Sequence, residues 1–162
     1  MALTAYLTLK GERQGQIKGS VTQRGRENTI AVTAAGHEIV SPRDPASGLP
    51  TGKRQHKPLT ITKDLDSSSP QLYAALAANE RLTEFLLQFF RTERTGAEKL
   101  AFTIRLTNVS ISGVHFTMPS NEDPALAKRP EYEQVSFVYE KIEWTWVEGG
   151  VTASDTWVTP TV

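Results

Sequence analysis

Residues 133–150, EQVSFVYEKIEWTWVEGG, show a two-residue alternation of hydrophobic side chains that changes phase partway along. The hydrophobic residues occupy first the odd positions Val135, Phe137 and Tyr139, and then the even positions Ile142, Trp144 and Trp146. Because successive side chains of a strand face opposite sides, the change requires a bulge or a sharp bend near Glu140 and Lys141. One regular, straight strand is therefore excluded.

A second long stretch, residues 99–116, changes phase in the same way between Leu106 and Val109. Bulges and kinks at corners are what a sheet needs in order to curl and close on itself. We therefore predict a mainly β protein, built as a small closed or strongly curved β-barrel. Further strands are predicted at residues 2–9, 28–40, 58–65, 82–95 and 151–158.

The segment DSSSPQLYAALAANE, residues 66–80, predicts one short α-helix. A serine at the cap position and Pro70 in the first turn are typical helix start signals. Apolar side chains then recur with the helical period, at Leu72, Tyr73, Leu76 and Ala77. The helix should end near Asn79.

Residues 41–53, SPRDPASGLPTGK, contain three prolines and two glycines. Proline lacks the amide hydrogen that an inner strand or the interior of a helix requires. We therefore expect this segment to be a long projecting loop.

The composition limits the classes of partner. A length of 162 residues suits one domain, residues 1–162, and the 18 basic side chains balance the 18 acidic ones. Without a net positive field, nucleic acid and anionic membranes are not expected partners. The chain contains no cysteine, which excludes disulfides and thiolate metal sites. Its amino terminus lacks the basic flank of a signal peptide, so a cytoplasmic product is expected.

No segment predicts catalytic or cofactor chemistry. The histidines His37, His56 and His115 have no ligand spacing between them, so we interpret them as hydrogen-bonded or solvated rather than metal-binding. GLPTGKR departs from a phosphate-binding loop, DLDSSSP departs from a calcium loop, and no serine lies in a GxSxG elbow. We expect no enzyme activity, no cofactor and no metal.

The aromatic residues Tyr139, Trp144, Trp146 and Trp157 permit two interpretations. They can form core and subunit interface, or a platform on which a ligand stacks. We favour core and interface. Hydrophobic residues at both odd and even positions cannot all face one core, so some apolar surface must be covered by a partner, and a second copy of the chain is the simplest partner. The alternative is a monomeric β-barrel binding module for a sugar or a small apolar ligand; a hydrolase is a third hypothesis.

Several motifs together resemble a known family. They are RQHKPLTITKDLDSSSPQLYAAL at residues 54–76, EQVSFVYEKIEWTWVEGG at residues 133–150, and SDTW at residues 154–157. In this combination the chain resembles the hemolysin-coregulated proteins of bacterial type VI secretion systems. The resemblance implies a β-barrel with one short helix that assembles into hexameric rings, which stack as the inner tube that a contracting sheath drives out of the cell; sheath, spike and effector proteins are the partners it implies. It also implies secretion without a cleaved signal peptide and effector proteins carried in the lumen. Some members of the family carry a toxin domain fused at the carboxyl end; since this chain stops at Val162, shortly after the last predicted strand, we expect none here.

The resemblance also implies roles for particular residues. Residues 42–53 match the family's extended loop between rings, which suggests ring-stacking contacts from Pro42, Arg43, Asp44, Lys53 and Arg54. Independently of the resemblance, the alternation makes three aromatic residues candidates for barrel core or subunit interface: Tyr139, Trp144 and Trp146. We expect one half of residues 133–150 to face the chain's own core and the other half a neighbouring subunit.

Overall fold

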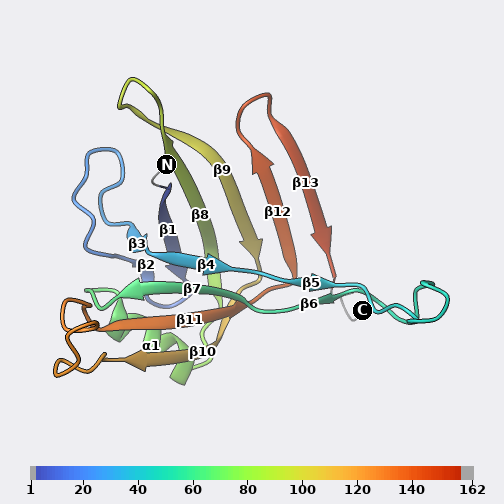
Figure 1. The fold of residues 1–162 in the computed structure, drawn as a ribbon, viewed down its shortest axis with the longest axis horizontal. Helices are drawn as coiled ribbons and strands as arrows, with labels where there is room; N and C mark the ends of the chain where they lie inside the picture. The colour runs from blue at the N-terminus through green and yellow to red at the C-terminus, as the bar shows by residue number, and fades with distance from the viewer. Residues whose placement is uncertain (1–2, 158–162) are drawn as a thin grey trace.

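The computed structural model describes residues 3–157, which form thirteen strands and one helix (Figure 1). The larger sheet contains β1 (Leu3–Gly11), β2 (Gly15–Ile17), β3 (Ile30–Val32), β8 (Leu82–Thr92), β9 (Glu98–Thr107), β12 (Lys141–Trp146) and β13 (Val151–Thr156). The smaller sheet contains β4 (Ala34–Gly36), β7 (Leu59–Asp64), β10 (Ser110–Thr117) and β11 (Tyr132–Val138). Two short strands, β5 (Ile39–Val40) and β6 (Gln55–His56), pair with each other, and the helix is α1 (Ser69–Ala77).

The two sheets cross each other instead of closing into one barrel. In Figure 1 the strands β1, β8, β9, β12 and β13 run nearly upright, while β4, β7, β10 and β11 lie across their lower part. The hydrogen-bonded orders are β13-β12-β9-β8-β1-β2, with β3 also paired to β1, and β10-β11-β7-β4. Both orders are open-ended, so the prediction of a closed barrel is wrong, whereas the mainly β fold with one short helix is confirmed. Crossed sheets of this kind have corners where a strand passes from one sheet to the other.

The two phase changes of the sequence mark such corners. Residues 99–116 form β9 and β10, and residues 133–150 form β11 and β12, with one strand of each pair in each sheet. At the first corner Asn108 has a positive φ of 54°, which asparagine adopts more readily than most residues. The two long strands predicted here are therefore four shorter strands. The strand predicted at residues 28–40 is likewise divided, into β3, β4 and β5.

Both halves of residues 133–150 bury the same core. Val135 and Phe137 of β11 and Ile142 of β12 have 0% exposed surface. Because the chain changes sheet and phase together, the hydrophobic side chains next to the corner on both strands point between the sheets. The expectation that one half faces a neighbouring subunit is therefore wrong for Ile142, and the outer end of β12 is the part left uncovered.

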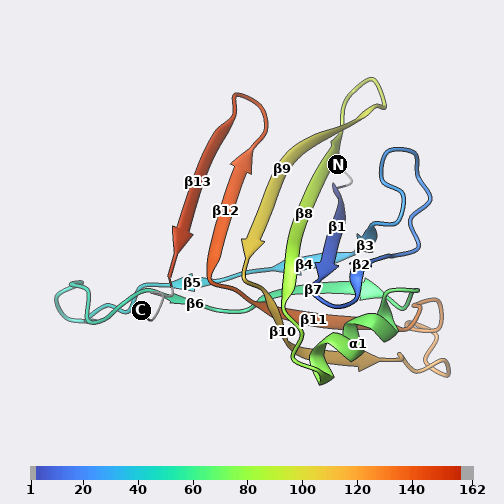
Figure 2. The ribbon, with the colours of Figure 1, turned by 180° about the vertical axis from the view of Figure 1, so that it is seen from behind.

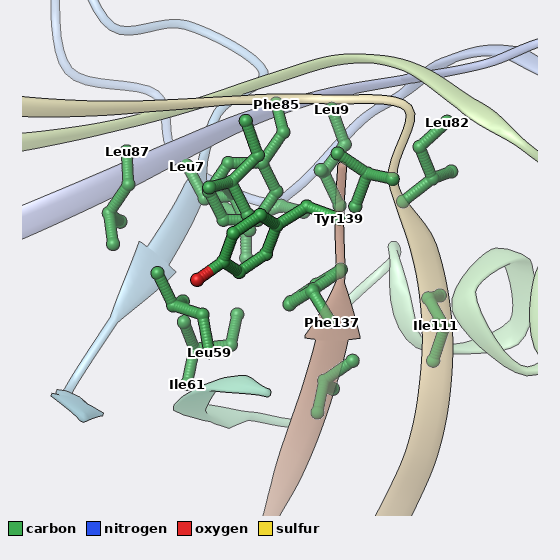
Figure 3. Close-up of a cluster of buried hydrophobic side chains, with 14 of the residues drawn as sticks. Leu7, Leu9, Leu59, Ile61, Leu82, Phe85, Leu87, Ile111, Phe137 and Tyr139 are labelled. Atoms are coloured by element: carbon green, nitrogen blue, oxygen red, sulfur yellow. The ribbon is translucent and has the colours of Figure 1, made fainter. Parts of the chain in front are cut away.

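The core lies where the sheets cross, and Figure 3 shows many of its side chains. Phe85 of β8 meets Phe137 of β11 edge to face, with ring centroids 4.9 Å apart, a favourable geometry for aromatic pairs. The ring of Tyr139 joins this cluster, and its hydroxyl oxygen points away from Leu82 and Ile111 (Figure 3). Tyr139 is thus both a core residue and a polar contact at the edge of the core.

The helix α1 lies beside β10 at one end of the molecule (Figure 2). Ser68 is its N-cap residue and Pro70 lies in its first turn, as the sequence predicted. Leu72 and Ala75 are its buried apolar residues, whereas Tyr73 is 37% exposed. The predicted apolar face was therefore wrong in including Tyr73 and Ala77, which are both exposed.

Candidate assembly surfaces

The inner face of the larger sheet continues beyond the smaller sheet as an uncovered strip. Strand register aligns five side chains across it, and we call them the apolar row: Ala5, Phe89, Phe102, Trp146 and Val151. The next inward-facing position on each strand, two residues closer to the smaller sheet, is buried in the core. These positions are Leu7, Leu87 and Ile104. Exposure along the row rises from 9% at Ala5 to 37% at Trp146 and 66% at Val151. The core surface therefore runs out into solvent along this end of the sheet.

A shallow groove of about 320 Å³ follows part of the apolar row. Its lining includes Leu3, Phe89, Phe102, Arg91 and Trp146. Leu3 is 57% exposed, and the guanidinium of Arg91 lies 5.2 Å from the centre of the Trp146 ring, within range of a cation–π contact. The groove is thus mostly apolar, with one cation beside the exposed indole.

The three predicted interface aromatics lie in three different environments. Tyr139 is buried, with 4% of its surface exposed. Trp144 is half-buried and packs against the core, and Trp146 belongs to the apolar row. The structure therefore assigns Tyr139 to the core and leaves Trp146 as the exposed member of the set. Trp157 lies elsewhere, stacked on His56 with ring centroids 5.4 Å apart, so the tryptophans form no common stacking platform.

The segment between β5 and β6 projects from the body of the molecule along its longest axis (Figure 1). Arg43 and Pro50 form an isolated antiparallel bridge, and the Asp44 amide donates to the Leu49 carbonyl at 2.9 Å. The Asp44 carboxylate accepts hydrogen bonds from the Ala46 amide and the Ser47 hydroxyl, at 3.1 and 2.7 Å. The predicted projecting loop is confirmed, and Asp44 stabilises its turn from within.

Arg54 contacts the chain itself at the base of this loop. Its guanidinium donates to both carboxylate oxygens of Asp155 in β13, at 2.6 and 2.7 Å, and to the Thr156 carbonyl at 3.1 Å. Such two-pronged pairs fix geometry as well as charge. Among the residues predicted to contact another ring, Arg43 and Lys53 are both exposed on the loop, whereas Arg54 holds the base of the loop through Asp155.

Five side chains, which we call the loop root, meet where the loop leaves the body: His37, Arg54, His56, Tyr139 and Asp155. The Tyr139 hydroxyl lies 2.5 Å from Nε2 of His37 and 2.7 Å from Nδ1 of His56. Nε2 of His56 lies 2.7 Å from an Asp155 oxygen. Above the ring of His56, the Trp157 indole donates to the Tyr139 carbonyl at 2.7 Å. The root therefore joins β6 and β13 to the corner between β11 and β12.

Electrostatics determine the direction of these hydrogen bonds. The bond from Arg54 is the main cause that holds the pKa of Asp155 below its ordinary value; burial opposes this effect, and His56 adds to it. Asp155 is thus a carboxylate, and its oxygen accepts a hydrogen bond from the Nε2–H group of His56. When His56 is neutral, its Nδ1 accepts a hydrogen bond from the Tyr139 hydroxyl, and the hydroxyl oxygen accepts one from the Nε2–H group of His37. Burial, and then the charge of Asp155, raise the pKa of Tyr139, so its hydroxyl stays protonated.

The histidines were predicted to be hydrogen-bonded or solvated, but nothing in the sequence pattern indicated that two of them share one partner. His37 and His56 meet at Tyr139, while His115 is exposed on β10. Asp155 was not singled out at all. The motif RQH at residues 54–56 and the motif SDTW at residues 154–157 contain most of the root, yet the contacts between them span about a hundred residues, which no local pattern reveals.

Two features are absent from residues 3–157. No three His, Asp or Glu side chains there are grouped so that they could hold a metal ion. No helix in the same range has the length and apolar character needed to cross a membrane.

Comparison with known proteins places the chain in a family. Residues 6–146 match the model of the family described as Type VI secretion system effector, Hcp. A relative from Pseudomonas aeruginosa, the Major exported protein, is 39% identical over 169 aligned positions, which cover 99% of this chain and 98% of the relative.

Solved structures agree with this result over nearly the whole length. An Hcp protein crystal structure superposes with a TM-score of 0.90 at 30% identity, covering 98% of this chain and all of the other. The Hcp1 protein of E. coli EAEC 042, in a mutant form with two introduced tryptophans, gives a TM-score of 0.85 at 36% identity, with 97% and 100% coverage. The chain is therefore a member of the Hcp family of type VI secretion proteins, as the motifs of its sequence suggested.

Proposed function

We propose that this protein is a structural subunit of the type VI secretion tube, which forms hexameric rings through the apolar row. The observation that carries the proposal is the exposure of Trp146 and Val151 at the open end of a sheet whose inner face is otherwise core. Covering apolar surface stabilises an assembly by about 25 cal/mol per Å². A second copy of the chain is the partner that family membership favours.

A ring follows when the two surfaces in contact are different parts of the same subunit. Such head-to-tail contacts close into a ring if the rotation between neighbours completes a circle. We propose that the apolar row meets a different face of the next copy, and that six copies close the ring. Geometry, rather than chemistry at an active site, is then the function of the chain, so we propose no enzyme activity.

The projecting loop suits contact between stacked rings. Arg43 and Lys53 offer charge on it, while the contacts of Asp44 and Arg54 stabilise its shape and its base. Exposed ion pairs contribute about 0 to 1 kcal/mol each, so they would set the register between rings more than the strength of the contact. We propose that the stacked rings leave the cell with effector proteins in their lumen, without removal of a signal peptide, and that sheath and spike proteins are further partners.

Light scattering coupled to size exclusion, together with negative-stain microscopy, tests the proposal. We expect a mass six times that of the 17.9 kDa chain, and ring-shaped particles. A monodisperse monomer at high protein concentration, without rings in low or high salt, would contradict it. A monomeric binding module for a sugar or an apolar ligand would instead show a change of tryptophan fluorescence on ligand addition, with no change of mass.

A further inference from the structure

The loop root is fastened through ionisable groups that come from separate parts of the chain. His37 precedes β5, Arg54 and His56 lie at β6, Tyr139 lies at the corner after β11, and Asp155 belongs to β13. His56 is 7% exposed and Tyr139 is 4% exposed. If apolar contacts alone held the loop to the body of the molecule, its attachment would not respond to pH. Here the attachment depends on the hydrogen bonds of two histidines.

The single proton of the Tyr139 hydroxyl limits how many protons the root can accept. With both histidines neutral, every donor has an acceptor, from His37 through Tyr139 and His56 to Asp155. With one added proton the chain stays complete: His56 donates from both nitrogens, Tyr139 donates to His37, and His37 accepts in its other tautomer. One protonation is therefore compatible with the closed root.

A second protonation is not compatible with it. Both histidines would then donate to the same Tyr139 oxygen, and the hydroxyl proton would have no acceptor among the root side chains. Two cations with ring centroids 6.2 Å apart would share Asp155, which is already paired with Arg54. A buried donor without an acceptor is costly, and like charges at this distance repel.

We infer that the loop root is an acid-sensitive fastening, which holds residues 41–53 while His37 or His56 is neutral and releases them when both are protonated. The regulatory consequence rests on the proposed function, because it assumes that this loop joins stacked rings. Acid would then weaken the contact between rings without breaking the rings themselves, since the apolar row contains no histidine and lies at the far end of the sheet (Figure 1).

The direction of the pH effect follows from His37. Burial, and then the positive charge of His56, lower the pKa of His37, while a backbone contact with Lys57 opposes the shift. The charged and titratable side chains around the two histidines are Tyr139, Asp155 and Arg54. A histidine whose pKa is lower in the closed state stabilises that state fully above about pH 6.5, and this stabilisation disappears as the pH falls through the lowered value.

Amide hydrogen exchange, followed by mass spectrometry of peptides that cover residues 37–57, tests the inference on the whole chain. The reporters are the Lys57 amide, which donates to the Glu38 carbonyl at 3.0 Å, and the pairing of β5 with β6. Protection would be compared at about pH 7.5 and about pH 5, after correction for the intrinsic exchange rate. We expect the wild type to lose protection at low pH by up to about tenfold per pH unit below 6.5.

Three variants distinguish an acid effect that acts through the loop root from a general effect of acid on the protein. His37→Gln keeps an amide donor for Tyr139 but does not titrate, so it should hold its protection at both pH values. His115→Gln, at an exposed site on β10, should behave as the wild type does. Tyr139→Phe keeps the ring in the core but removes the hydroxyl, so residues 37–57 should exchange fast already at neutral pH. Equal acid loss in the wild type and in His37→Gln, or no acid loss in the wild type, would overturn the inference.

Acid release of the loop and ring formation can be judged independently in the same samples. Exchange reports on the root in rings and in monomers alike, so a chain that never forms rings would contradict the proposed function and leave the exchange result to be judged by itself. Where stacked rings form, sedimentation should show that acid separates the wild-type stacks and spares those of His37→Gln. Stacks of both proteins that survive acid equally would overturn the regulatory consequence.

Discussion

Nζ of Lys63 lies 2.6 Å from Oε1 of Glu133, and neither side chain has any exposed surface. Lys63 also lies 3.0 Å from the Asp66 carboxylate. Ser69 donates to the same Glu133 oxygen at 2.8 Å, and Tyr73 donates to the other oxygen. This network fastens the first turns of α1 to the strands β7 and β11, with each buried charge paired and hydrogen-bonded.

Replacing one partner of that pair should destabilise the fold strongly. Lys63→Met leaves the Glu133 carboxylate buried without its cation, which typically costs about 3 to 5 kcal/mol. Urea denaturation, with the midpoint and slope compared to the wild type, measures the loss. Lys99→Met is the matched control, because Lys99 lies 3.9 Å from Glu93 in an exposed pair that contributes about 1 kcal/mol or less. Similar losses in both variants would contradict the role of the buried pair.

Tyr73 should ionise unusually late. Burial, and then its hydrogen bond to Glu133, raise the pKa of Tyr73 to about 12. Since an unfolded tyrosine ionises near pH 10, the unfolded chain loses a proton that the folded chain retains, so stability should fall as the pH rises through this window.

An alkaline titration of phenolate absorbance detects this ionisation. We expect Tyr73→Phe to remove one step near pH 12 from the profile. Tyr132→Phe, a tyrosine outside the network, is the control and should leave that step in place. A profile of Tyr73→Phe that keeps the step would contradict the assignment.

Gly19 should not tolerate a side chain. A Cβ atom there would lie 2.3 Å from the Thr29 carbonyl oxygen and 2.7 Å from Cα of Ile30, both of them backbone atoms. We expect Gly19→Ala to lower the free energy of unfolding by about 1 to 3 kcal/mol, as other overpacked sites do. Gly36→Ala is the control, because a Cβ at Gly36 meets nothing within 4 Å. Urea midpoints that shift equally for both variants would show that the close backbone approach is unimportant.

A charge at Trp146 should separate assembly from folding. Because Trp146 is 37% exposed and lies in the apolar row, Trp146→Glu should abolish rings in light scattering while the far-ultraviolet circular dichroism of the fold persists. Thr152→Glu adds the same charge on the opposite face of the neighbouring strand and should spare the rings. An unfolded Trp146→Glu chain would show instead that the indole is part of the core.

Local patterns identified most of the strand-forming segments, the helix and the loop, but not where three of the predicted strands are divided. Alternation predicted the strands, the serine and Pro70 predicted the start of α1, and the prolines of residues 41–53 predicted the loop. Alternation could not distinguish a bulge within one sheet from a chain that passes from one sheet to a second sheet. In both cases the hydrophobic side chains change from odd to even positions. The closed barrel was therefore predicted where the chain forms two open sheets, with Glu140 at a corner between them.

The candidate site was predictable only in part. Trp146 was identified as an interface candidate from its alternation, but its burial depends on where β4 and β7 cross the larger sheet. Arg54 was predicted to meet another ring, yet it pairs with Asp155, which lies 101 residues later. Contacts over such distances depend on strand order and register, which a pattern with a period of two does not contain.

By itself, the sequence determined the mainly β class, the family and the existence of two bends, since these follow from local alternation and from recognisable motifs. Only the tertiary structure decided which surfaces are buried. Lys63 and Glu133 are ordinary surface types that become a dry ion pair because two strands and a helix enclose them. The three residues His37, His56 and Tyr139 become one network because three distant segments meet at a corner, where folding brings together groups that the chain itself keeps apart.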